Sequence, residues 1–215
     1  MKCRYCGSDC VKDGCQTDGT QRYKCKKCKR RQQKDYSSNA YDLNTDLSII
    51  KYIKEGVGIR GLSRLLDIST TTVLKRILLI SSKISPPHVI ANAIYEVDEI
   101  KTFVGCKSNH IWIAYALNRE TKSVVSFSVG PRTNNTLNQV LDKLTNAKRI
   151  YTDRLKNYKY LIDPAIHRTT LYGTNHIERH NLTIRTHIKR LNRRTICFTR
   201  KAGVLYAILK IYFWG

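Results

Sequence analysis

Apolar residues recur at helical spacing in the segment 44–84 and predict three helices there. The first helix is expected to start after a polar cap at Asn44 or Thr45 and to end at Gly56. The second is expected over Ile59–Leu66, with its leucines on one face, and a polar turn follows it. Short helices joined by tight turns are typical of a helix-turn-helix module.

The third helix of this segment carries the residues expected to read DNA. Ser69 or Thr70 is expected to cap it, and its apolar face is expected to contain Val73, Ile77 and Leu78. Small polar and basic side chains near its start suit contact with the DNA major groove. The candidates are Thr71, Thr72, Lys75 and Arg76. Three packed helices also serve ordinary protein contacts, so this alternative stays open.

Beyond Ala91 the apolar period changes to that of strands. The expected order is three strands, a helix, a fourth strand, and then further helix with one more short strand. This order is typical of an RNase H-like α/β domain, although periodicity alone leaves other mixed folds open. The predicted elements are strands at 94–104, 111–117, 124–129, 149–152 and 167–171 and helices at 135–144, 174–191 and 204–212.

Composition narrows the class of partner. The chain has 215 residues and 41% hydrophobic content, enough for one medium domain with smaller modules. Its formal net charge is +23, from 39 Lys and Arg against 16 Asp and Glu. Such an excess favours a polyanion, and the candidates are nucleic acid, an anionic membrane surface or an acidic protein. The sequence has neither an apolar run long enough to span a bilayer nor a hydrophobic signal segment, so we expect a cytoplasmic protein with nucleic acid as its leading partner and no membrane partner.

Six of the eight cysteines lie in the first 28 residues and indicate a metal site. Cys3 and Cys6 form one CxxC pair, and Cys25 and Cys28 form a second pair after 18 intervening residues. Two such turns can present four thiolates to one Zn²⁺ ion in tetrahedral geometry. A segment this short buries little apolar surface, so the metal would supply its stability. The sequence therefore predicts a structural zinc ribbon over residues 1–36.

Two further cysteines and a basic run accompany the zinc ligands. Cys10 and Cys15 are less suitably spaced, and whether either joins the zinc stays open at this point. Residues 24–34 read KCKKCKRRQQK, a basic surface suited to phosphate contact or simply to solvation.

Acidic residues are scarce in the last part of the chain. Residues 121–215 contain four acids and 18 Lys and Arg, and Glu178 is the sole acid among the last 52 residues. A carboxylate works against phosphate binding unless a cation lies between them. Asp98 on the first strand, Asp153 at the end of a later strand and Glu178 on a helix could converge to hold two Mg²⁺ or Mn²⁺ ions for phosphoryl transfer. The alternative is an ordinary ion pair at each acid.

Several segments together resemble the transposases of the insertion sequence one family, of the InsA–InsB fusion type. The resemblance extends over nearly the whole chain, and its most specific part is the run IERHNL followed three residues later by Arg. The segments that carry it are 96–99 (EVDE), 103–107 (FVGCK), 151–153 (YTD) and 176–185 (HIERHNLTIR).

The resemblance implies a catalytic role for three acids and DNA contacts for nearby basic residues. In that family the acids at the matching positions bind the catalytic metals, which assigns this role to Asp98, Asp153 and Glu178. Arg154 departs from the small residue that the family has after its second Asp. His176 and His180 are open as DNA contacts or as packed side chains. The basic residues expected to contact phosphates are Arg179, Arg185, Lys189, Arg190, Arg193 and Arg194.

The sequence therefore predicts a DDE transposase with a zinc ribbon at 1–36, a helix-turn-helix module at 42–84 and an RNase H-like catalytic domain at 91–215. It would bind the terminal inverted repeats of its element and perform metal-dependent cleavage and strand transfer into target DNA. Because two ends must be held together, a homodimer or higher homo-oligomer is expected. One alternative is a transcription regulator with an inactive nuclease domain, and another is an RNase H-like nuclease acting on RNA–DNA hybrids.

Overall fold

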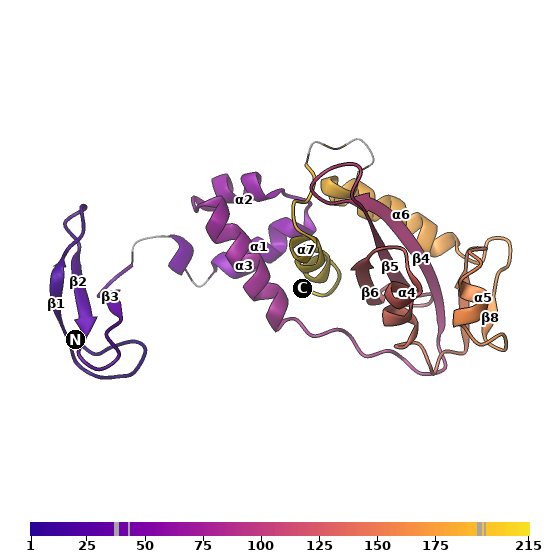
Figure 1. Ribbon diagram of the computed structural model, residues 1–215, viewed down its shortest axis with the longest axis horizontal. Coiled ribbons are helices and arrows are strands. Elements are labelled where there is room, and N and C mark those ends of the chain that lie inside the picture. Colours follow the sequence, from indigo (N-terminus) through magenta and orange to yellow (C-terminus); the bar gives the residue numbers. More distant parts are fainter. Residues whose placement is uncertain (37–38, 43, 193–194, 196) are drawn as a thin grey trace. The chain divides into compact units, whose positions relative to one another are not determined.

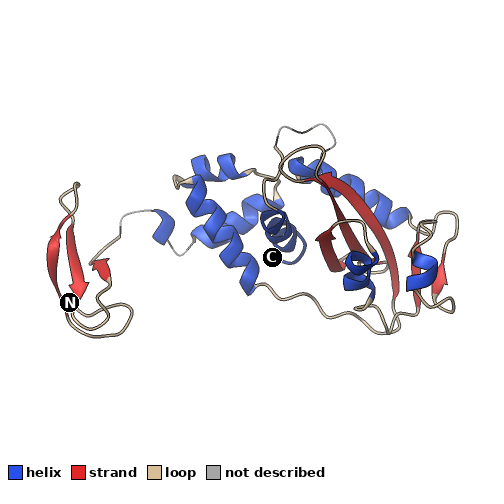
Figure 2. Cartoon of the chain, in the orientation of Figure 1, coloured by secondary structure: helices blue, strands red, loops and turns tan. Residues whose placement is uncertain are grey.

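The computed structural model describes residues 1–36, 39–42, 44–192, 195 and 197–215. The chain divides into two compact units, Met1–Leu43 and Asn44–Gly215, and each is described by itself (Figure 1). The first unit is a small sheet, and the second combines helices with a larger sheet (Figure 2).

The first unit is a three-stranded antiparallel sheet with very little interior. Its strands, in the order β1-β2-β3, are β1 (Cys10–Cys15), β2 (Gln21–Cys25) and β3 (Arg31–Gln33). Gly14, at the irregularity near the end of β1, and Gly19, in the turn to β2, have positive φ, a conformation that glycine adopts without strain. Within residues 1–36 only Cys3, Cys25 and Gln32 are buried. So little buried surface cannot offset the chain entropy lost on folding, which indicates that another interaction stabilises this sheet.

After a short 3₁₀ turn, η1 (Asn39–Tyr41), the second unit begins with three helices. They are α1 (Thr45–Lys54), α2 (Ile59–Leu66) and α3 (Thr70–Lys83). Gly56 has a φ of 74° and donates its N–H to the carbonyl of Ile53, so it ends α1 as predicted. Ser69 caps α3 by accepting the backbone N–H of Thr72 at 3.1 Å.

Two leucines assigned to the apolar faces of these helices lie on the surface instead. The buried residues of α3 are Val73, Ile77, Ile80 and Ser81, a spacing that turns Leu78 outward. Leu78 is 45% exposed, and Leu65 of α2 is 59% exposed. The prediction that these two leucines face the helical core was therefore wrong, because the buried stripe of each helix is narrower than its apolar composition suggested.

The larger sheet has five strands in the order β6-β5-β4-β7-β8. The pairs β6-β5 and β5-β4 are antiparallel, whereas β4-β7 and β7-β8 are parallel. The strands are β4 (Ile94–Phe103), β5 (His110–Asn118), β6 (Val124–Gly130), β7 (Arg149–Thr152) and β8 (His167–Arg168). This mixed α/β arrangement confirms the predicted class.

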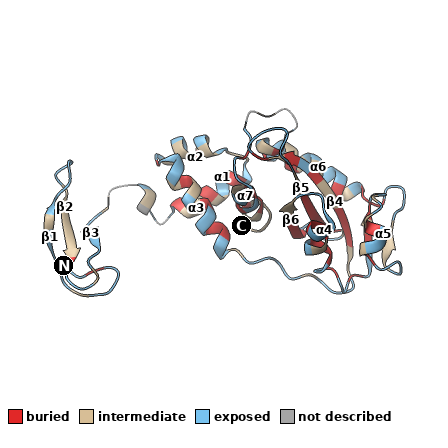
Figure 3. Cartoon of the chain, viewed as in Figure 1, coloured by how far each residue is buried: buried red, intermediate tan, exposed pale blue. Residues whose placement is uncertain are grey.

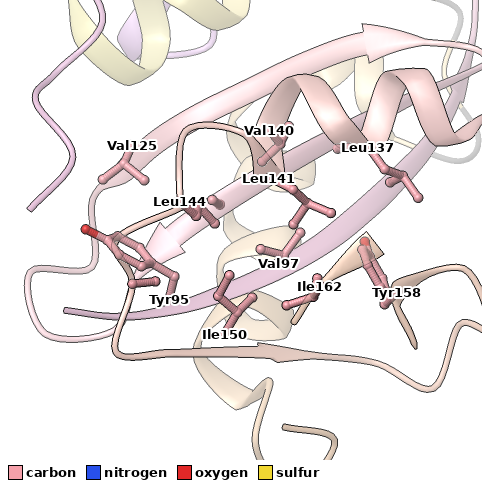
Figure 4. Packing of buried hydrophobic residues seen from close by; sticks show 13 residues of the cluster. Tyr95, Val97, Val125, Leu137, Val140, Leu141, Leu144, Ile150, Tyr158 and Ile162 are labelled. Carbon is pink, nitrogen blue, oxygen red and sulfur yellow. The ribbon is translucent and has the colours of Figure 1, made fainter. Parts of the chain in front are cut away.

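One face of the sheet packs against α4 (Asn134–Leu141) and α5 (Tyr158–Leu161). Tyr95 and Val97 of β4 contribute the sheet side of this cluster, and Leu137 and Val140 contribute the α4 side (Figure 4). Burial of these apolar side chains, at about 25 cal/mol per Å², stabilises the layer and fixes β4 in register. Alternate residues of β4 consequently point to the opposite face.

The opposite face packs against α6 (Asn175–His187) and α7 (Ala202–Trp214). Ile177 and Ile184 of α6 and Leu209 of α7 are completely buried there. Helix α7 also contacts α1 and α3, so it belongs to two packing layers at once. In Figure 3 the buried residues follow the central strands and the helix faces that meet them.

Three elements end clearly earlier than predicted. The helix expected at 135–144 is α4, which ends at Leu141. The strand expected to reach Leu171 stops at Arg168, since a turn containing Gly173 follows. The helix expected to run through Leu191 leaves α geometry at Ile188 and continues as a 3₁₀ turn, η2 (Lys189–Leu191). Among the described residues, no helix has the length and apolar content needed to cross a membrane.

Candidate functional site

The first candidate site is a group of four cysteines in the small sheet. Cys3 and Cys6 meet Cys25 and Cys28 with all four sulfur atoms within 4.8 Å of one another. The Sγ atoms of Cys3 and Cys28 are 3.6 Å apart, and those of Cys6 and Cys25 are 3.5 Å apart. A tetrahedron with Zn–S bonds of about 2.3 Å has edges of about 3.8 Å, so the four thiols could hold a zinc ion.

Backbone N–H groups donate hydrogen bonds to two of the four sulfur atoms. The N–H groups of Tyr5 and Cys28 each donate to a ligand sulfur, Cys3 Sγ and Cys25 Sγ, at 3.4 Å. Hydrogen bonding to Ser8 lowers the pKa of Cys6 to about 6. Such donors stabilise the negative charge of a metal-bound thiolate.

The remaining cysteines of this unit stay outside the group. Cys10 Sγ accepts from Gln32 at 3.7 Å, and burial raises the pKa of the Cys10 thiol. Cys15 is exposed and contacts the side chain of Gln21. The close group of four sulfur atoms is formed by the two CxxC pairs and does not include Cys10 or Cys15.

The second candidate site begins at Asp98 on β4. This strand directs Glu96 and Asp98 toward the face covered by α6, because residues two apart in a strand share a face. Asp98 Oδ1 accepts the backbone N–H of Glu99 at 2.7 Å, and Oδ2 accepts from Asn181 Nδ2 at 2.6 Å. Asn181 Oδ1 accepts the hydroxyl of Tyr115 at 2.7 Å, so its amide can present only its NH₂ group to Asp98. The carboxylate of Asp98 is held in one orientation.

The parallel pairing of β4 with β7 brings Asp153 to Asp98. Val97 pairs with Thr152, so each acid is the next residue along its strand. Burial raises the pKa of Asp98 to about 6, and repulsion by the charge of Asp153 adds to the rise, against the two hydrogen bonds that lower it. Two neighbouring carboxylates that repel each other are suited to a divalent cation, which prefers hard oxygen ligands. Asp98 and Asp153 therefore fit a magnesium or manganese ion.

Glu178 lies on the helix that contacts Asp98, in the first turn of α6. Its carboxylate accepts the hydroxyl of Thr174 at 2.8 Å, and the residue is exposed. Asn181 follows three positions later, and Cβ atoms at this spacing are about 5–6 Å apart on one helix face. Among the described residues only the cysteines form a close group of three or more metal ligands. The structure thus places Asp98 and Asp153 at the ends of neighbouring strands, and Glu178 lies three positions before Asn181, which contacts Asp98.

Glu96 fixes the start of α6 against the sheet. Its side chain is fully buried, and Oε2 accepts the backbone N–H of Ile177 at 2.8 Å. Arg119 Nε lies 3.3 Å from Oε1, an ion pair without hydrogen-bond geometry. A negative charge at a helix N-terminus is favourable because it satisfies N–H groups that have no partner within the helix.

The predicted DNA-contact residues of α3 differ in their availability. Thr71 and Lys75 are exposed, and Thr72 is partly buried beside its cap. Arg76 forms an ion pair with Asp46 of α1 at 3.1 Å, so its charge is already shared.

The basic residues near α6 divide in the same way. Arg179 and Lys189 are exposed, whereas Arg185 donates to the carbonyls of Leu191 and Lys101. Arg190 donates to the hydroxyl of Thr199, and burial lowers its pKa. Arg193 and Arg194 lie outside the described residues.

Sequence reasoning overlooked three residues around Asp98. Glu96 shares a strand face with Asp98, and Asn181 shares a helix face with Glu178, so residue spacing could have identified both. Tyr115 could not be found this way, because its role depends on which residue of β5 pairs with Asp98. Its hydroxyl also lies 3.3 Å from His180 Nδ1, and burial lowers the pKa of that histidine. His180 is therefore a packed side chain.

Known proteins share the sequence around these acids. A family model described as IS1 transposase matches residues 91–213. The chain belongs to this family. The insertion element iso-IS1n protein InsB of Shigella dysenteriae is 41% identical over 113 residues, which cover 52% of this chain and 86% of that protein. The insertion element IS1 2 protein InsB of Escherichia coli (strain K12) is 35% identical over 124 residues, 56% of this chain and 73% of that protein.

Membership in the IS1 transposase family confirms the resemblance found in the sequence. The matched range contains Asp98, Asp153 and Glu178 and begins after the three N-terminal helices. One similar solved structure is the simian T-cell lymphotropic virus intasome in complex with PP2A regulatory subunit B56 gamma. It gives a TM-score of 0.38 at 18% identity, over 76% of this chain and 66% of that chain, which is too low to support an argument.

Proposed function

We propose that this chain is a DNA transposase that binds the terminal inverted repeats of its element and cuts and joins DNA with Asp98, Asp153 and Glu178. The observation that carries the proposal is the paired carboxylate site of Asp98 and Asp153 within a domain of the IS1 transposase family. The large positive charge of the chain supports a nucleic-acid partner. The proposed fold of this domain is RNase H-like, over residues 91–215.

Each part of the chain has a distinct role in this proposal. Asp98 and Asp153 hold the divalent ions, and Glu178 completes their ligands from the first turn of α6. When bound, the two ions activate the nucleophile and stabilise the leaving oxygen of an in-line displacement. Asn181 and Glu99 keep the Asp98 carboxylate oriented, and Glu96 holds α6 against β4. These contacts limit how far the acids can move during the reaction.

The two N-terminal modules would select the DNA. A zinc ribbon at 1–36 and a helix-turn-helix module at 42–84 would bind the terminal repeats, with Thr71 and Lys75 on the exposed side of α3. Arg179 and Lys189 would contact phosphates beside the cut. Two ends must be joined in one reaction, so a homodimer or larger homo-oligomer is part of the proposal.

A cleavage assay with matched variants tests this function. Purified protein is mixed with labelled duplex that carries the ends of its element, with magnesium or with EDTA. Glu178→Gln should abolish nicking and leave end binding unchanged, because the amide keeps the shape of the side chain and loses its charge. Glu120→Gln, an exposed acid between β5 and β6, serves as the control. Wild-type cleavage rates in Glu178→Gln would reject the assignment, and end binding without any cleavage would indicate a regulator.

A further inference from the structure

A tight turn between β8 and α6 exposes two large apolar side chains next to each other. Leu171 is 75% exposed and Tyr172 is 71% exposed. Tyr172 also has a φ of 63°, a left-handed backbone conformation that is strained for a bulky residue. Exposed apolar side chains and local strain together indicate a binding surface rather than a packing surface.

The turn packs closely against β7 and leads directly into α6. A Cβ atom on Gly173 would lie 2.7 Å from Tyr151 Cδ1 and 2.8 Å from Thr170 Oγ1, so only glycine fits there. Tyr151 belongs to β7 and precedes Asp153 by two residues. Thr174 then starts α6 and donates its hydroxyl to Glu178. The turn is therefore clamped between the strand that leads to Asp153 and the helix that carries Glu178.

Chain length limits the distance between the turn and the proposed cut. Glu178 lies six positions after Tyr172, and at about 3.4 Å per step the two are at most about 20 Å apart. Stacked base pairs repeat about every 3.4 Å, so the turn lies within about six base pairs of a phosphate at the site.

The chemistry of the turn favours DNA bases over a protein partner. Residues 164–177 contain no acid, and the exposed Arg179 lies in the first turns of the helix that follows, so a polyanion can approach the turn. Two side chains of this kind cover about 150–250 Å² each at most, well under the roughly 800 Å² per partner of a stable protein interface. Bases offer flat apolar faces on which such side chains stack or between which they insert.

We propose that Leu171 and Tyr172 form a wedge that enters the base stack of DNA within about six base pairs of the phosphodiester cut at Asp98, Asp153 and Glu178. This inference rests on the proposed function and adds a second contact to it. The wedge keeps the bases beside the cut unstacked. Because Gly173 packs closely against Tyr151 and Thr170, the position of the wedge is fixed relative to α6.

The test measures the unstacking of DNA bases directly by fluorescence. The full chain is titrated into a 20-base-pair duplex in which every adenine of one strand is 2-aminopurine, a base whose fluorescence rises when it is unstacked. Binding is measured separately by anisotropy of the same duplex carrying fluorescein. The wild-type protein should raise the 2-aminopurine signal. Tyr172→Gly should lose most of that signal and bind roughly 5- to 100-fold more weakly, the range for loss of one stacked base.

Three variants distinguish the contribution of the Tyr172 ring from that of its backbone conformation and from that of exposed apolar side chains in general. Glycine adopts the left-handed conformation of residue 172 without strain, so Tyr172→Gly should remain folded with an unchanged or higher melting temperature. Tyr172→Phe keeps the ring and should keep the signal. Ile90→Ser removes another exposed apolar side chain, 53% exposed and outside the proposed modules, and should behave as wild type.

The outcomes distinguish this inference from the proposed function. If the wild-type protein binds DNA without any rise in fluorescence, or if Tyr172→Gly retains the full rise, the wedge is refuted while transposase function stands. If Tyr172→Gly changes the oligomer mass in light scattering and leaves the fluorescence unchanged, the turn is a protein contact and the wedge is again refuted. If the wild-type protein binds no DNA, the proposed function fails and the wedge fails with it.

Discussion

The half-buried carboxyl of Asp98 should lower the stability of the metal-free protein at neutral pH, and this contribution should be absent at acidic pH. Its pKa of about 6 lies above the ordinary value of 3.8. Between these two pH values the native state binds more protons at this group than the unfolded state does. The free energy of unfolding therefore decreases as the pH rises through this window. Above pH 6 the destabilisation caused by the charged Asp98 carboxylate is fully present.

The size of the effect follows from the shift. The difference of 2.2 pH units (6 − 3.8), at about 1.36 kcal/mol per unit, corresponds to about 3 kcal/mol. Asp98→Asn removes the charge, but it also disturbs the hydrogen bond from Asn181, which costs about 1 kcal/mol. The variant should thus be more stable than wild type by about 2 kcal/mol at pH 8, a rise of about 4–8 °C in melting temperature for a unit of this size.

Thermal unfolding followed by circular dichroism in EDTA at pH 4.5 and pH 8 measures this difference. At pH 4.5 Asp98 is mostly protonated in the native state, so the advantage of Asp98→Asn should largely vanish. Asp142→Asn, which alters an exposed carboxyl at the end of α4, is the control and should show no such pH-dependent gain. Equal stability of Asp98→Asn and wild type at pH 8, or the same difference at both pH values, would refute the reasoning.

Two further predictions concern metal binding. Cys25→Ser should unfold the first unit and leave the melting of residues 44–215 within about 2 °C of wild type, because the two units have separate cores; limited proteolysis with and without a zinc chelator measures this, and an intact first unit in both cases would contradict it. Asn181→Ala should weaken Mn²⁺ binding roughly 10- to 100-fold in isothermal titration without a loss of fold, because Asp98 loses the donor that orients it. Thr183→Ala on the same helix is its control, and unchanged Mn²⁺ affinity in Asn181→Ala would argue against an orienting role.

The sequence predicted the elements whose signals are local. The close grouping of Cys3, Cys6, Cys25 and Cys28 follows from their spacing alone, and the positions of α2 and β7 follow from apolar period and flanking turn residues. Helix caps such as Ser69 were also predictable, because the cap and the N–H it accepts are three residues apart.

Features that depend on distant residues could not be predicted in this way. The choice of which leucine of α3 is buried depends on the neighbouring elements, including α7, more than a hundred residues later. Arg185 and Arg190 donate hydrogen bonds to carbonyl and hydroxyl groups of other segments, and the local sequence does not show these partners. A basic run in the sequence therefore overstates the number of charges that face a phosphate backbone.

Because α7 packs against α1 and α3, the first helices complete their packing only after the last helix has been synthesised. Residues 202–214 leave the ribosome well over a hundred residues after Lys83, and at about 5–20 residues per second the delay is on the order of ten seconds. Throughout that interval the apolar surface of α1 and α3 lacks a neighbour, and a chain that stops before α7 keeps it exposed. Helices α1 and α3 thus reach their fully packed form only on a chain that already contains Asp98, Asp153 and Glu178.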